Sequence, residues 1–148
     1  MKRSHSLNIN PRPLPSLLLK AGPACKNMKI TSTRAMDSKK EMGRYVYICR
    51  DCGCRITGQS YETAVNSKHI HVFSNPHGKV FEIGCFSDAA CMAIGPATIE
   101  FTWFQGFFWN IVICRSCRRH LGWLYSRREN HFYGLILQAL VKQESKET

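Results

Sequence analysis

Two cysteine pairs of the form C-x-x-C constrain the fold of this 148-residue chain more than any other feature. Cys49 and Cys52 form the first pair, and Cys114 and Cys117 form the second. Two such pairs can supply four thiolates to one tetrahedral zinc ion, which then has no open coordination position. The sequence therefore predicts one structural Zn²⁺ bound by these four cysteines.

The two pairs are too far apart for a local zinc finger. Between Cys52 and Cys114 lie 61 residues, whereas the halves of local fingers are about 12–20 residues apart. We therefore expect the metal to join an early hairpin to a late one. Cys54 is an alternative ligand, although C-x-x-C closes a tighter turn. Cys85 and Cys91 are expected to be small buried thiols, with a disulfide between them as the alternative.

The positive charge of the chain is concentrated near its N-terminus. Residues 1–44 hold ten Lys/Arg and two acids, whereas residues 45–148 hold eleven Lys/Arg and eight acids. A domain that binds nucleic acid carries its basic residues on the folded surface, so no nucleic-acid partner is predicted. No apolar run approaches the ~20 residues of a membrane span, so no membrane partner is predicted either.

Composition divides the chain into three parts. Residues 1–43 are rich in proline and basic residues without an apolar period, which predicts a disordered leader that contributes nothing to the fold. Residues 44–142 are expected to form one domain, and residues 143–148 a polar tail. Zinc thiolates favour a reducing intracellular compartment over secretion, although small relatives of this type can also be secreted. The acid-free first 36 residues resemble a mitochondrial presequence, so the compartment stays open.

The domain reads as antiparallel β with one late helix. Short runs rich in β-branched and aromatic residues predict strands at 45–48, 69–73, 80–83, 108–113 and 120–125. A helical period then predicts one C-terminal amphipathic helix, with Asn130 as a plausible N-cap. The residues that carry this period are Phe132, Leu135, Ile136, Ala139 and Leu140.

Three tryptophans surround the second cysteine pair within 21 residues: Trp103, Trp109 and Trp123. Tryptophans in a small domain are usually part of the core. Here Gly106 and several polar residues interrupt the aromatic run, as a pocket rim requires. We therefore expect an aromatic pocket held beside the metal.

Residues 44–142 resemble the CULT domain, the thalidomide-binding domain of the cereblon family and of small single-domain relatives. The shared motifs occur in the family's order and at similar spacing. They are ICRDCG at 48–53, NPHG at 75–78, EFTWFQGFFW at 100–109, CRSC at 114–117, HLGW at 120–123 and FYGL at 132–135. The resemblance implies the β-tent fold, in which zinc pins two antiparallel sheets.

The resemblance also implies a binding site. Trp103, Trp109 and Trp123 match the three walls of an aromatic cage, Tyr125 its floor, and Asn75 the loop that caps it. The implied ligands are cyclic imides, namely glutarimide and uracil-like rings, or C-terminal cyclic imides of proteins.

Backbone groups near Phe101, Thr102 and Trp103 are expected to pair with the imide. Phe101 stands where the family has a histidine, and Gln105 where it has a proline, which leaves ligand affinity and preference open.

The chain is thus expected to be a non-enzymatic binding module whose partner is a small cyclic imide or a modified protein terminus. One alternative is a methyl-ammonium reader with Glu100 or Glu82 as its carboxylate. Another is a methionine-sulfoxide-reductase-like oxidoreductase that uses Cys85 or Cys91. We expect no ubiquitin-ligase adaptor as partner, because the chain is too short for the Lon-like region and docking segment of the cereblon family.

Overall fold

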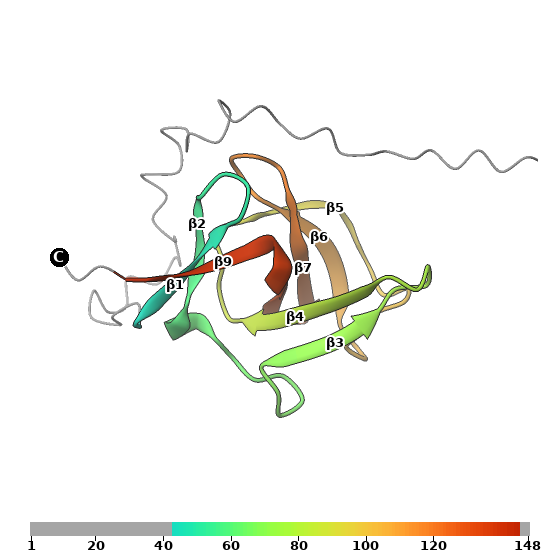
Figure 1. Ribbon diagram of the computed structural model, residues 1–148. Coiled ribbons are helices and arrows are strands. Elements are labelled where there is room, and N and C mark those ends of the chain that lie inside the picture. Colours follow the sequence, from blue (N-terminus) through green and yellow to red (C-terminus); the bar gives the residue numbers. More distant parts are fainter. Residues whose placement is uncertain (1–42, 146–148) are drawn as a thin grey trace, which may run out of the picture.

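The computed structural model describes residues 43–145, so nearly all of the predicted leader and the end of the predicted tail lie outside it. The described chain forms two antiparallel β-sheets (Figure 1). This confirms the prediction of a mainly β fold. The strands are β1 Tyr45–Cys49, β2 Arg55–Gly58, β3 Ile70–Ser74, β4 Val80–Phe86, β5 Met92–Thr98, β6 Phe108–Ile113, β7 His120–Arg127, β8 Asn130–Ile136 and β9 Leu140–Glu144.

The smaller sheet joins the two ends of the domain. Its strand order is β2-β1-β9, and the central strand β1 pairs with β9 from Tyr45 opposite Glu144 to Cys49 opposite Leu140. Strand β9 therefore extends beyond residue 142, the predicted end of the domain. The first cysteine pair begins at the last residue of β1, so this sheet positions half of the predicted metal site.

The larger sheet has the strand order β3-β4-β8-β7-β6-β5. Its β6–β7 hairpin carries the second cysteine pair in the connection between the two strands. The register places Trp109 opposite Tyr125 and Ile111 opposite Trp123. Because alternate residues of a strand share one face of the sheet, these four side chains lie on the same face.

The prediction of a C-terminal helix is wrong. Residues 130–136 form strand β8, which pairs with both β7 and β4, and only Leu137–Ala139 make a single 3₁₀ turn, η3, before β9. The apolar period from Phe132 to Leu140 suggested a helix, although its residues belong to three elements, β8, η3 and β9. Hydrogen bonds to two neighbouring strands outweigh a weak local helical preference. Within residues 43–145, no helix has the length and apolar character of a membrane span.

Two groups of buried side chains form the core. The first joins the sheets and includes Cys49 and Ile56 from the small sheet with Phe86 and Leu121 from the large one. The second is an aromatic layer against the large sheet, built around Phe104, Tyr125 and Phe132. This aromatic layer supports the cavity described below.

Candidate functional site

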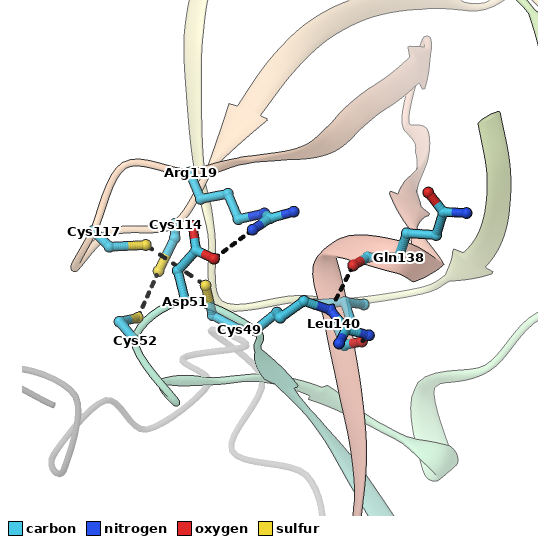
Figure 2. A network of polar contacts seen from close by, with 9 residues as sticks. Cys49, Asp51, Cys52, Cys114, Cys117, Arg119, Gln138 and Leu140 are labelled. Carbon is cyan, nitrogen blue, oxygen red and sulfur yellow. Dashed lines mark hydrogen bonds and ion pairs between the residues drawn. The ribbon is translucent and has the colours of Figure 1, made fainter. Parts of the chain in front are cut away.

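The four cysteines of the two C-x-x-C pairs converge in space. Their sulfur atoms all lie within 4.8 Å of one another. The Sγ–Sγ distance is 3.6 Å between Cys49 and Cys117 and 3.5 Å between Cys52 and Cys114, and Figure 2 shows the four side chains grouped together. A tetrahedral zinc–thiolate site with bonds of about 2.3 Å separates its sulfurs by about 3.8 Å. The cluster therefore fits a tetrahedral metal ion of this kind.

Both cysteine pairs have the same backbone turn. In the first, the Gly53 N–H donates to the Cys49 carbonyl at 2.9 Å; in the second, the Arg118 N–H donates to the Cys114 carbonyl at 2.9 Å. These two donors hold equivalent places and both have left-handed backbone, with φ of 75° and 63°. Glycine adopts this conformation freely, whereas arginine adopts it at a cost of about 1–2 kcal/mol. The two turns thus present their sulfurs with similar geometry.

Contact between the thiols of Cys49 and Cys114 shifts their pKa values in opposite directions. A hydrogen bond with the Cys49 thiol lowers the pKa of Cys114 to about 5, because it stabilises the thiolate. The same contact, together with burial, raises the pKa of Cys49. A cation among the four sulfurs would stabilise their thiolate forms, since thiolates are the metal-binding species.

Polar contacts hold the first cysteine pair against its neighbours (Figure 2). Arg119 forms an ion pair with Asp51, which lies between the two cysteines of the first pair. Arg50 donates from Nε to the Gln138 carbonyl at 2.7 Å and from Nη2 to the Leu140 carbonyl at 3.2 Å. These contacts connect both cysteine turns and the start of β9 without a metal ion.

The other described cysteines lie outside the cluster. Cys54 is buried but does not belong to the group of converging sulfurs, so the alternative ligand set is not supported. Cys85 and Cys91 are buried free thiols, which confirms the prediction and excludes a disulfide between them. Burial raises the pKa of each of these two thiols to about 12.

A cavity of about 610 Å³ opens beside the β6–β7 hairpin. We call it the tryptophan cavity. All three tryptophans line it, and Tyr125, which is 2% exposed, lies at its base. The full lining is Asn75, Pro76, His77, Lys79, Phe81, Phe101, Trp103, Trp109, Ile111, His120, Trp123 and Tyr125. Six of the seven residues assigned to a ligand site from the sequence are therefore brought together.

The tryptophan rings are held by contacts with different elements. Trp103 and Trp123 meet edge to face, with ring centroids 4.8 Å apart and planes at 74°. The Trp103 indole N–H donates to the Ser74 carbonyl at 3.2 Å, and that of Trp109 donates to the Glu100 carbonyl at 2.8 Å. Each ring is thus fixed in orientation, as a wall for a flat ligand requires.

The rim is formed by two loops. Asn75 closes the β3–β4 turn, where its Oδ1 accepts from the N–H groups of His77 at 3.0 Å and Lys79 at 2.9 Å. Phe101 has left-handed backbone with φ of 56°, and its side chain is 72% exposed although it lines the cavity. An exposed aromatic ring on strained backbone at a cavity mouth is a feature more typical of a binding surface than of a core.

The seventh assigned residue, Thr102, does not line the tryptophan cavity. Its hydroxyl donates to the Phe104 carbonyl at 3.1 Å and its N–H to the Ile99 carbonyl at 3.3 Å, so it stabilises the loop. Among the described residues, no hydrogen bond engages the backbone N–H or C=O of Phe101 or Trp103.

Several lining residues were missed from the sequence, among them Phe81, Ile111 and His120. Phe81 lies 5.2 Å from Trp123 and His120 lies 5.0 Å from the same ring, both edge to face. Strand alternation alone would have placed Ile111 on the face of Trp109. Burial lowers the pKa of His120, whose Nε2 lies 3.0 Å from the Gly122 carbonyl and therefore donates to it.

No carboxylate lines the tryptophan cavity within the described chain. Glu100 contributes only its carbonyl, to Trp109, and Glu82 lies outside the lining. The lining contains one Lys or Arg side chain, that of Lys79, whose Nζ lies 5.0 Å above the Phe81 ring. The electrostatic character of the cavity is therefore neutral to positive.

The chain is similar in sequence to several proteins named cereblon. The protein from Drosophila simulans is 30% identical over 100 residues, which cover 61% of this chain and 17% of that protein. The protein from Danio rerio is 30% identical over 109 residues, or 63% of this chain and 25% of the relative. The protein from Drosophila melanogaster is 30% identical over 83 residues, which cover 53% of this chain and 14% of that protein.

The match therefore spans a quarter or less of the length of these relatives. No family model matches the chain. The similarities nevertheless confirm the resemblance to the cereblon family that the motifs indicated.

Proposed function

We propose that this cereblon-like domain is a non-enzymatic binding module whose tryptophan cavity takes a cyclic imide. The observation that carries the proposal is the convergence of three tryptophan rings on one cavity whose described lining has no carboxylate. The ligand class is a glutarimide or uracil-like ring, free or at the C-terminus of a protein as a cyclised Asn or Gln.

The chemistry of the imide ring matches the cavity. Its apolar edge would leave water against the tryptophan faces, which contributes about 25 cal/mol per Å² of apolar surface buried. Its N–H and carbonyl groups would need partners, because each polar group left unpaired costs about 1–3 kcal/mol. The backbone groups of Phe101 and Trp103, which no described hydrogen bond uses, are the candidates at this side of the cavity.

The four-cysteine cluster would hold one structural Zn²⁺. Its support is the donor set of four thiols at sulfur separations close to those of a tetrahedral site. The ion would supply stability alone, because four thiolates leave no position for a substrate. It would fix the β6–β7 hairpin, and with it two walls of the cavity, relative to β1.

Two other functions have less support. A reader of methylated amines needs a negative group near the cage, yet the lining offers Lys79 and no carboxylate. An oxidoreductase needs a reactive thiolate at the site. Cys85 and Cys91 are buried, have raised pKa values, and do not line the cavity.

The test is a calorimetric titration of the full chain with glutarimide, N-methylglutarimide and trimethyl-lysine. We expect glutarimide to bind, and the N-methyl compound to bind at least about tenfold more weakly because it has lost the only donor. Binding of trimethyl-lysine in preference to glutarimide would replace the imide proposal with the methyl-ammonium one. Absence of binding to any of the three would refute both.

A further inference from the structure

A second cavity, of about 910 Å³, lies beside the turn that joins β7 to β8. It shares no lining residue with the tryptophan cavity. Phe104 and Phe132 form its floor, and Tyr125, which contacts both rings, belongs to the tryptophan cavity. The aromatic layer therefore separates the two cavities. We call the second one the Arg127 cavity, after the cation in its lining.

Arg127 is an exposed residue with two neighbours in the lining, Phe107 and Gly106. Its guanidinium lies 5.0 Å above the centre of the Phe107 ring. Gly106, with φ of 86°, lies directly beside it, since a Cβ there would come within 3.4 Å of Arg127 Nη1. A guanidinium above an aromatic face keeps the N–H groups in its own plane available to a partner. Within residues 43–145 none of these N–H groups has a hydrogen-bond acceptor or a carboxylate partner.

The rest of the lining consists of apolar residues, uncharged polar residues and His131. Phe104 is 1% exposed and Phe132 5% exposed, so these two rings close the floor but present little surface of their own, whereas Phe107 is partly exposed. Thr63, Asn66, Gln105 and Asn130 supply uncharged polar groups, and the lining contains no Asp or Glu. One arginine beside aromatic side chains, in a lining without Asp or Glu, is complementary to a singly charged anion with an apolar body.

We propose that the Arg127 cavity binds organic carboxylates that carry an aromatic or branched apolar group. The carboxylate accepts two N–H bonds from the Arg127 guanidinium, a geometry that matches its planar fork. The apolar group lies against Phe107, above the floor that Phe104 and Phe132 close. The carboxylate belongs either to a free small acid or to the C-terminus of a peptide, two sources with the same chemistry. This inference does not depend on the imide proposal, since the two cavities share no residue.

The test uses the ¹⁵N-labelled full chain and ¹H–¹⁵N correlation spectra, in the absence of any imide. The probes are 3-phenylpropanoate and a Gly-Gly-Phe peptide with a free C-terminus. Their controls are 3-phenylpropanamide and the amidated peptide. We expect at least one acid to bind with a Kd on the order of 1 mM, as suits a ligand of this size. Shifts should concentrate at the amides of Gly106, Phe107, Arg127 and Asn130.

Matched variants test the role of the guanidinium. Arg127→Gln should weaken binding about tenfold or more. Lys142→Gln, which removes a cation 3.7 Å above the Tyr45 ring on the other sheet, should leave binding unchanged. Binding of the small acid alone, or of the peptide alone, supports the proposal and identifies the source. No shifts up to about 10 mM of either acid, equal binding of the amides, or unchanged binding to a folded Arg127→Gln variant would overturn it.

Discussion

Trp103 and Trp123 meet edge to face, with ring centroids 4.8 Å apart, although one lies in the loop before β6 and the other in the middle of β7. Phe81 of β4 contacts both rings, at 5.8 Å and 5.2 Å. Two walls of the tryptophan cavity are therefore positioned by packing among three separate segments. The third wall, Trp109, is set by strand register opposite Tyr125.

Loss of one wall should weaken imide binding. Trp109→Ala is expected to lower glutarimide affinity by about 1–3 kcal/mol, or roughly five- to a hundredfold, because it removes one stacking face. Trp109→Phe keeps an aromatic face and should lose less. Calorimetry measures the affinity, and zinc analysis checks that the fold is intact. If Trp109→Ala binds glutarimide like the unaltered chain, the ring is not a cavity wall.

The metal should be essential for folding. Purified chain is expected to contain one zinc per molecule, and Cys117→Ser to lose both metal and β-sheet circular dichroism, since structural zinc contributes on the order of 10–16 kcal/mol. Cys85→Ala, which removes a buried thiol outside the cluster, should keep its zinc. A metal-free chain that retains its β-sheet signal would show that Arg119, Asp51 and the core suffice.

Glu62 connects β1 to the segment after β2. Its Oε1 accepts hydrogen bonds from the hydroxyls of Tyr47 at 2.6 Å and Tyr45 at 3.1 Å. Glu62→Ala leaves both hydroxyls without this acceptor and should lower the free energy of unfolding by about 1–3 kcal/mol. Glu62→Gln keeps an acceptor oxygen and should lose less. Urea unfolding of the two variants compares them, and equal losses would contradict this account.

Gly122 of the HLGW motif permits the close approach of β7 to β8. A Cβ at this position would lie 2.1 Å from the Gly134 carbonyl oxygen. Gly122→Ala must therefore displace backbone, and we expect a loss of more than about 2 kcal/mol in thermal or urea unfolding. Gly78→Ala is the control. At Gly78 φ is 80°, but a Cβ would have no neighbouring atom within 4 Å, so this substitution introduces backbone strain without a steric clash. A smaller loss for Gly122→Ala than for Gly78→Ala would refute the steric explanation.

His120 should make the fold sensitive to acid. Burial lowers its pKa below the ordinary value of 6.5. Below that pH the unfolded chain takes up a proton that the folded chain does not, so stability falls as the pH drops from about 7 to about 5. In urea unfolding, His120→Gln should reduce this fall relative to the unaltered chain. An unchanged pH dependence in His120→Gln would assign the effect to other groups.

The cysteine pairs and the three tryptophans were identifiable from the sequence because each is carried by a short local motif. Spacing alone brought Cys49 near Cys52 and Cys114 near Cys117. The equivalent turns at Gly53 and Arg118 then present all four sulfurs in one small volume. Strand alternation likewise accounts for Trp123 and Tyr125 on one face of β7.

What the sequence could not decide depends on contacts between distant segments. The helical period at 132–140 did not produce a helix, because β8 forms backbone hydrogen bonds with two partner strands, β4 and β7. No local pattern in the sequence reveals this pairing. Sheet order and packing place Phe81 and His120 in the cavity lining. Thr102 lies outside the lining, because its hydroxyl donates to the Phe104 carbonyl in its own loop. The sequence by itself thus determined the chemistry of the cysteine cluster and of the cavity walls, since these reside in side-chain type and local spacing. Only the tertiary structure decided which residues complete the cavity and where Arg127 lies, because strand pairing and ring packing are made across the chain.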